Sequence, residues 1–481
     1  MTGETTDAGE ASGPILYWVR RDFRLGDNPG LSAAAESGRP VIPVFILDEV
    51  MEGHGACPRW RMGLGAEAFA TALEGIGSRL IFRRGKALEV LRALVAETGA
   101  GSVWWGRAYD PEAIARDKAV KAGLKEDGID ARSWAGHLLF EPWTVETKTG
   151  DFYKVYTPFW KSVKDREVPA ALPGVSALTA PGAWPGSEDP GDWDLARAMN
   201  RGAEIVRAHL TIGEDAARGR LAQFIGHKVA DYAEARDIPG VQGTSRVSEN
   251  LTYGEISPRT AWHSGMRAFN EGKRGAETFL KELVWREFAY HLAYHTPRIV
   301  SGNWREEWDA FPWNEDERTA EVKAWKQGRT GICFVDAAMR ELYVTGYMHN
   351  RARMIVASYL TKHLMCHWRI GQAWFEDCLI DWDPASNAMG WQWSAGSGPD
   401  ATPYFRVFNP VTQLDKFDKN RDYASRWIAE GQGRPPKDAL AYFEAIPRRW
   451  NMSPDDAYPD PVVTADEGRK RALAAYENRD F

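Results

Sequence analysis

The sequence contains little cysteine, and its cysteines do not have the spacing of a metal site. The four residues, Cys57, Cys333, Cys366 and Cys378, lie far apart, and no CxxC occurs. A zinc site and a disulfide framework are therefore disfavoured, because both use cysteines at characteristic spacings. We interpret the four residues as reduced thiols of a cytoplasmic protein.

Long apolar runs and a secretory leader are also missing. No stretch approaches the roughly 18 apolar residues that predict a membrane-spanning helix, so a membrane protein is disfavoured. Residues 1–13, MTGETTDAGEASG, are polar and acidic, which predicts a flexible tail and no signal peptide. The net charge of −7 argues against non-specific binding of polyanions, but a local basic face remains open.

A dinucleotide-binding glycine motif is absent where it would be expected. The turn after the first apolar run reads RRDFRLGDNPG at residues 20–30, without the GxGxxG that lets a pyrophosphate approach the backbone. A nicotinamide dehydrogenase is therefore disfavoured. Any nucleotide cofactor is expected to bind elsewhere in the chain.

Short β-rich runs alternate with helical ones in the first part of the chain. Stretches rich in Ala, Leu and Glu, such as 66–76 and 87–97, separate apolar runs at 15–20, 41–48, 79–84 and 102–108. This alternation is typical of βαβ units and predicts a Rossmann-like parallel sheet. We assign this α/β domain to residues 14–145.

The middle of the chain is rich in residues that interrupt regular structure. Residues 169–191 hold five prolines and four glycines, which cannot sustain a long helix or a central strand. We therefore predict an interdomain linker over residues 146–202. The composition from about Ala203 onward is helical, so residues 203–481 are predicted to form an all-α domain.

Tryptophan is abundant, with 22 residues, and two of them stand two positions apart in MGWQWSAGSG at 389–398. Core packing is the simplest interpretation of such a pair. On a helix Trp391 and Trp393 would meet different surroundings, whereas on a strand they would share a face. These ten residues alone do not decide between the two.

Four segments of the helical half, taken together, resemble the photolyase and cryptochrome family of flavoproteins. They read TSRVS at 244–248, ELVWREF at 282–288, TGYMHNRARM at 345–354 and DWDPASNAMGWQWSAGSGPDATPYFRVFNP at 381–410, and RRDFRLGDN near the start is similar as well. The resemblance implies an α/β antenna domain, a long linker and a helical domain that binds FAD.

The resemblance also implies a set of cofactor-binding residues. Hydroxyl and guanidinium groups at 244–248 suit a phosphate, although a helix cap is the alternative. Asp381 and Asp383 could be an acid–base pair or loop caps; the family pattern makes them flavin ligands, with Asp381 paired to Arg353. An amide at Asn387, beside flavin N5, is typical of repair rather than signalling. The implied FAD contacts are Tyr232, Thr244, Ser245, Arg246, Val247, Ser248, Glu282, Arg286, Arg353, Asp381, Trp382, Asp383 and Asn387.

Electron supply and lesion binding are implied in the same way. Trp391, Trp368 and Trp313 match the family's electron-transfer tryptophans, although Trp304, Trp308 and Trp325 could be confused with Trp313. Trp393 and Trp285 match aromatic walls of the lesion pocket, and a protonated Glu282 would donate a hydrogen bond to the lesion. The implied DNA and lesion contacts are Arg236, Trp285, Arg286, Asn350, Arg351, Met354, Trp393, Arg406 and Gln413.

The implied activity is blue-light repair of cyclobutane pyrimidine dimers in DNA, by electron transfer from excited reduced FAD to a flipped-out dimer. Asn350 and Met354 replace two histidines of the (6-4) photolyases, which favours cyclobutane dimers. A cryptochrome photoreceptor and a (6-4) or DASH-type photolyase are the alternatives. As second chromophore, methenyltetrahydrofolate is favoured over a deazaflavin. We expect a cytoplasmic monomer that binds UV-damaged DNA without sequence preference and has no membrane partner.

Overall fold

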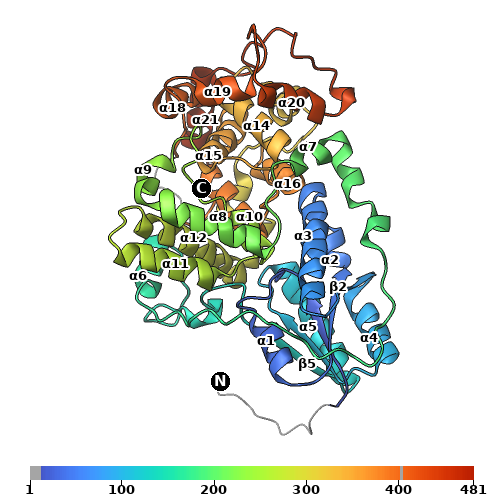
Figure 1. The fold of residues 1–481 in the computed structure, drawn as a ribbon. Helices are drawn as coiled ribbons and strands as arrows, with labels where there is room; N and C mark the ends of the chain where they lie inside the picture. The colour runs from blue at the N-terminus through green and yellow to red at the C-terminus, as the bar shows by residue number, and fades with distance from the viewer. Residues whose placement is uncertain (1–11, 401–404) are drawn as a thin grey trace.

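The computed structural model describes residues 12–400 and 405–481, which form an α/β part and a helical part (Figure 1). The predicted tail lies almost wholly outside the described residues. The α/β part contains a parallel sheet in the order β3-β2-β1-β4-β5. Its strands are Ile15–Val19 (β1), Val41–Leu47 (β2), Ile81–Arg84 (β3), Ser102–Gly106 (β4) and Asp130–Trp134 (β5).

Both faces of this sheet are covered, so its central strands are apolar throughout. Every residue of β1 and β2 is buried, as expected for parallel strands with helices on both sides. Helices α1 (Pro29–Glu36) and α3 (Ala56–Gly75) pack with one face, and α4 (Ala87–Thr98) and α5 (Pro111–Glu126) with the other. The predicted α/β fold class of this part is confirmed.

The connection to the helical part is only partly irregular. Helix α6 (Tyr156–Val163) lies within the predicted linker, and its buried residues belong to the core of the helical part. No helix or strand occurs between residues 169 and 189, all of which are described. That proline-rich stretch runs along the α/β part, where the Val41 amide donates to the Thr179 carbonyl at 2.9 Å.

The rest of the chain is helical, and no β-strand occurs in its described residues from 203 onward. The helices are Ala203–Arg207 (α7), Glu214–His227 (α8), Tyr232–Ala235 (α9), Ser248–Thr252 (α10), Pro258–Asn270 (α11), Ala276–His295 (α12), Ala320–Lys326 (α13), Cys333–Thr345 (α14), Asn350–Ser358 (α15), Trp368–Cys378 (α16), Pro384–Ala395 (α17), Pro410–Phe417 (α18), Asp422–Trp427 (α19), Lys437–Ala445 (α20) and Ala465–Glu477 (α21). The predicted all-α domain is confirmed. None of the described helices is long and apolar enough to cross a bilayer.

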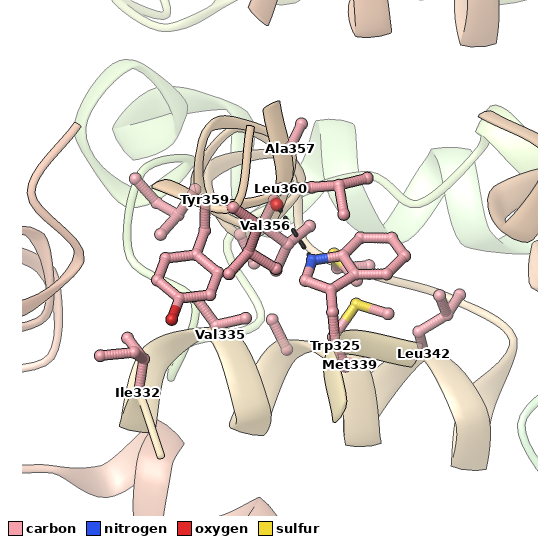
Figure 2. Packing of buried hydrophobic residues seen from close by; sticks show 14 of the residues in the cluster. Trp325, Ile332, Val335, Met339, Leu342, Val356, Ala357, Tyr359 and Leu360 are labelled. Atoms are coloured by element: carbon pink, nitrogen blue, oxygen red, sulfur yellow. Dashed lines mark hydrogen bonds between the residues drawn. The ribbon is translucent and has the colours of Figure 1, made fainter. Parts of the chain in front are cut away.

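Large aromatic side chains fill the core of the helical part (Figure 2). Trp325 is fully buried, and its indole N–H donates to the Val356 carbonyl at 3.1 Å. This bond satisfies the polar atom of a tryptophan in an otherwise apolar environment. Trp325 is thereby held between α14 and α15, beside Met339 and Leu342 (Figure 2).

A buried ion-pair network joins the two parts. Arg61 of α3 has no exposed side-chain surface; its Nε lies 2.7 Å from Glu249 Oε1 and its Nη2 lies 2.8 Å from Glu255 Oε2. Arg220 of α8 lies 3.1 Å from the other oxygen of Glu249. Two buried carboxylates are thus balanced by two arginines across the domain boundary.

Candidate functional site

The centre of the candidate site is a pair of aspartates before α17. Asp383 caps this helix, accepting the Ser386 amide at 2.8 Å, and it also accepts the hydroxyl of Tyr290. Asp381 accepts from Arg353 Nη2 at 2.9 Å and from the Ser248 hydroxyl at 2.8 Å. Asp381 is therefore held by an arginine and a serine from segments far apart in the sequence.

The predicted phosphate segment, residues 244–248, is shaped by its neighbours. Arg246 has φ 53°, the left-handed conformation that side chains other than glycine rarely adopt. Arg220 Nη1 donates to the Arg246 carbonyl at 2.7 Å and holds this backbone in place. The Arg246 guanidinium lies 4.2 Å from the ring centroid of Tyr347. Tyr347 therefore packs against the phosphate segment.

Trp391 and Trp393 lie on helix α17, so the two indoles have different surroundings. Trp391 is 2% exposed and packs on the backbone of α16, where a Cβ on Gly371 would lie 2.0 Å from the Trp391 ring. Trp393 is half-buried. On the same helix, Asn387 Nδ2 donates to the Gln372 carbonyl at 3.1 Å, which orients the amide predicted to face the flavin.

The three predicted electron-transfer tryptophans are buried. The His367 ring lies between two of them, 5.4 Å from Trp368 and 5.2 Å from Trp313. Trp313 donates its N–H to the Thr361 carbonyl at 2.9 Å. Trp325, which the sequence offered only as an alternative to Trp313, contacts the Trp391 ring edge-on, with centroids 6.0 Å apart. No local spacing signals that contact, because the two residues are 66 positions apart.

Helix α12 carries the predicted lesion-pocket residues. Trp285 stacks on Tyr156 of α6, with centroids 3.6 Å apart and an interplanar angle of 6°. Sequence reasoning missed Tyr156, which comes from the predicted linker. One turn earlier, Glu282 Oε1 lies 2.5 Å from Arg236 Nη1. Burial raises the pKa of the Glu282 carboxyl above its ordinary value, and Arg236 offsets only part of that effect.

The predicted DNA contacts fall into two groups. Asn350 and Arg406 are exposed, whereas Met354 and Gln413 are half-buried. Arg351 is paired with Asp237 at 2.7 Å and packs over the ring of Phe417.

Arg286 is mostly buried, and its assignment as a phosphate contact stays a prediction. Its side chain is 12% exposed, and its guanidinium bonds to the carbonyl and ring nitrogen of His137 at 2.8 and 2.7 Å. These bonds direct it toward the α/β part. Its Nε is buried without an acceptor among the described residues, and the assignment of Arg286 as a cofactor contact likewise remains a prediction.

The residues of this site are suited to a flavin nucleotide. The hydroxyl-bearing segment meets the paired carboxylate of Asp381, and α17 carries an oriented amide; in the described part of the chain, the buried donors Arg286 Nε and Trp382 Nε1 have no acceptor. A ligand with ring and ribityl oxygens would supply such acceptors. Among the described residues, no cluster of His, Cys, Asp and Glu could hold a metal ion.

Comparison with known proteins identifies the class that this fold and site define. Residues 15–176 match the family model described as DNA photolyase, and residues 279–478 match that of the FAD binding domain of DNA photolyase. The chain therefore belongs to the DNA photolyase family, which is an FAD-binding family that includes the cryptochromes.

Individual relatives place the chain more closely within this family. It is 43% identical to the deoxyribodipyrimidine photo-lyase of Agrobacterium fabrum, over 96% of this chain and 97% of that one. A crystal structure of a bacterial class III photolyase from Agrobacterium tumefaciens superposes with a TM-score of 0.88 at 41% identity, covering 98% and 99% of the two chains. Cryptochrome-1 of Arabidopsis thaliana is 33% identical over 98% of this chain and 71% of its own length.

Proposed function

We propose that this protein is a deoxyribodipyrimidine photo-lyase that repairs cyclobutane pyrimidine dimers in DNA under blue light. The observation that carries the proposal is that Arg353 and Ser248 hold Asp381 just before α17, the helix that carries Asn387 and the half-buried Trp393, in a chain 43% identical to a photo-lyase. FAD, when bound, supplies the light-absorbing electron donor.

In this scheme the chain's own residues position the cofactor and polarise it. Arg353 and Ser248 fix Asp381, and the segment at 244–248 offers hydroxyls and a guanidinium to phosphate oxygens. Trp391 and its buried neighbours resupply electrons from the protein surface. For the α/β part we propose a second chromophore, methenyltetrahydrofolate in preference to a deazaflavin.

The proposed binding of the substrate rests on the predicted lesion-pocket residues of α12. Flipping a pyrimidine dimer out of the DNA stack costs less free energy than flipping intact bases, because the lesion already weakens base pairing. Trp285, supported from behind by Tyr156, presents a flat surface to it. Asn350 and Met354 leave this face without the paired histidines of (6-4) enzymes, which supports a cyclobutane substrate. We propose that the protein acts as a monomer in the cytoplasm.

A signalling cryptochrome is the second candidate, favoured by the 33% identity to cryptochrome-1 and by the buried tryptophans. Repair of a defined thymine cyclobutane dimer in duplex DNA by the FAD-loaded, chemically reduced protein separates the two. Light-dependent restoration of thymine is expected, with none in the dark. Binding and photoreduction of FAD without restoration of thymine would contradict the enzyme proposal. Repair of a (6-4) product alone would change the assigned substrate from the cyclobutane dimer to the (6-4) product.

Glu282 is expected to make repair depend on pH. Burial raises the pKa of this carboxyl, so the protonated donor persists to higher pH than usual and is lost as pH rises through the raised pKa. Repair should decline over that range. Glu282→Ala should lower the repair rate by about tenfold or more, as for a lost hydrogen bond to developing charge.

Glu282→Gln retains a donor and cannot ionise, so its repair rate should be flat over the same pH range. Glu277 lies on the same helix but is exposed and paired with Lys281 at 2.8 Å, so Glu277→Gln serves as the control and should match the unaltered protein. An unchanged pH profile in Glu282→Gln would rule out titration of this residue.

A further inference from the structure

The indole N–H groups of the predicted electron relay, Trp391, Trp368 and Trp313, have different surroundings. Trp391 Nε1 is buried and has no acceptor among the described residues. Trp313 Nε1 donates to the neutral backbone carbonyl of Thr361 at 2.9 Å. Trp368 is fully buried, and its Nε1 donates to the side-chain oxygen of Asn303 at 2.7 Å. The acceptor of Trp368 is therefore a side chain, which its own hydrogen-bond partners can polarise.

Asn303 connects Trp368 to a carboxylate. It is 2% exposed, and its Nδ2 donates to Asp309 Oδ1 at 2.8 Å. Asp309 itself is exposed and lies on the 3₁₀ turn Glu306–Ala310. The two partners fix the orientation of the amide, because only its oxygen can accept the indole N–H and only its nitrogen can donate to a carboxylate.

Arg298 holds this connection in place. Its Nε donates to the backbone carbonyl of Asn303 at 2.9 Å, and its Nη2 pairs with the second oxygen of Asp309. The Asn303 amide, followed by the Arg298 guanidinium, lowers the pKa of Asp309 below its usual range. The Asp309 carboxylate is therefore ionised at neutral pH.

An ionised carboxylate at one end of the amide strengthens the hydrogen bond at the other end. Hydrogen bonds to charged groups are stronger than neutral ones, and bonds in a chain polarise one another. Arg298 offsets part of the Asp309 charge in the surroundings, so the effect reaches Trp368 mainly through the Asn303 amide. The Asn303 oxygen is thus a better acceptor than an amide without such a partner.

This acceptor favours the oxidised form of Trp368. An indole that loses an electron becomes cationic, and its N–H becomes a stronger donor, so a polarised oxygen stabilises the cation more than the neutral ring. Trp391 has no acceptor of this kind among the described residues. Transfer of one electron from Trp368 to oxidised Trp391 is therefore favoured over its return.

We propose that Asn303 and Asp309 are positioning residues of the electron relay. Trp391 gives one electron to photoexcited FAD and takes one from Trp368, and an external thiol finally replaces that electron. Asn303 presents its polarised oxygen to Trp368 during this step, and the N–H proton stays on the indole. The inference rests on the proposed relay through Trp391 and Trp368, and it does not involve the DNA lesion.

Asp309→Asn tests the proposal, because it removes the charge and retains an oxygen that can accept from Asn303. Reduction of bound FAD by a thiol under blue light should slow by roughly three- to tenfold, part of the contribution of a hydrogen bond to a charged group. Glu306→Gln is the matched control, since Glu306 lies on the same turn and pairs with the same Arg298 at 3.8 Å. An unaltered rate in Asp309→Asn, or an equal loss in Glu306→Gln, would overturn the proposal.

A double substitution shows whether Asp309 acts through Asn303. Asn303→Leu should slow photoreduction at least as much as Asp309→Asn, and adding Asp309→Asn to it should have no further effect. Additive losses would mean that the carboxylate acts without the amide and would overturn the role of Asn303. Thermal unfolding and FAD content identify a leucine variant that fails to fold, in which case the single substitution at Asp309 decides.

The hydrogen bond can also be observed in the dark. In FAD-loaded protein with isotope-labelled tryptophan, the magnetic resonance signal of the Trp368 N–H proton is identified by its loss in Trp368→Phe. Asp309→Asn should shift this signal upfield, because a weaker hydrogen bond leaves the proton more shielded, whereas Glu306→Gln should not. A shift with unaltered photoreduction would indicate a purely structural contact and overturn the proposal.

Failure of the relay and failure of this inference give different results. Absence of photoreduction in the unaltered protein would reject the relay and, with it, the roles of Asn303 and Asp309. Loss of photoreduction in Trp391→Phe together with an unaltered rate in Asp309→Asn would keep the relay and reject these roles alone.

Discussion

Replacement of Arg61 by alanine is expected to destabilise the protein by about 3–5 kcal/mol, because it leaves the buried Glu255 carboxylate without its cation and removes one of the two cations that pair with buried Glu249. Arg61 bonds to both Glu249 and Glu255 and has no exposed side-chain surface. Glu249 also pairs with Arg220, which holds the Arg246 carbonyl. The variant should therefore release FAD at a lower temperature as well as unfold earlier. Thermal unfolding and the appearance of free flavin fluorescence measure the two effects.

Arg59→Ala is the control for this prediction. Arg59 lies on the same helix, and its guanidinium donates to the exposed Glu52 carbonyl at 2.8 Å and to no carboxylate of the described residues, so its loss should have little effect. In the Arg61→Ala background, Glu255→Gln should restore part of the stability because it removes one uncompensated charge. If Arg59→Ala and Arg61→Ala melted alike, the network would not hold the two parts together.

Trp391→Phe is expected to nearly abolish blue-light reduction of bound FAD by an external thiol. Phenylalanine fills most of the indole's space but is far harder to oxidise, so the relay loses its first member. After chemical reduction of the flavin, the same variant should repair a cyclobutane dimer at the unaltered rate, since Trp391 is buried against Gly371 and not in the lesion pocket. Flavin absorbance under illumination and thymine recovery separate the two readouts.

The onward route from Trp391 can be resolved with two further variants. Trp368→Phe interrupts the predicted relay, and Trp325→Phe interrupts the edge contact at 6.0 Å. The larger loss of photoreduction identifies the route in use, with Trp427→Phe as a buried tryptophan outside both. Photoreduction at the unaltered rate in Trp391→Phe itself would contradict the proposed relay.

Local sequence patterns were sufficient for most of the fold. Four runs became β1 to β4, because β1, β2 and β4 are apolar and buried over nearly their whole length and β3 begins with the buried pair Ile81 and Phe82. Strand β5, DARSW, was not predicted, since it lies at the sheet edge and carries polar side chains. Its strand conformation comes from pairing with β4, which a short window of sequence does not reveal.

The site was predictable only where a motif is continuous. The run at 381–410 contains Asp381, Asp383 and Asn387, which the structure places on and just before one helix, and their roles as flavin ligands stay predictions. The contacts of Tyr156 with Trp285 and of Trp325 with Trp391 join residues more than 60 positions apart. Such pairs depend on the packing of whole helices, so neither periodicity nor spacing could indicate them.

Helix α6 has a consequence for how this chain could be divided into independently produced halves. Tyr156, Phe159 and Val163 are buried in the core of the helical part, although α6 precedes the proline-rich stretch. A cut at 169–189 would leave these apolar side chains on the wrong fragment, exposed to water and prone to aggregation. A gene segment for the helical half therefore has to begin before residue 156, and it then carries the irregular stretch, whose Val175 and Leu178 are buried in the core of the α/β part.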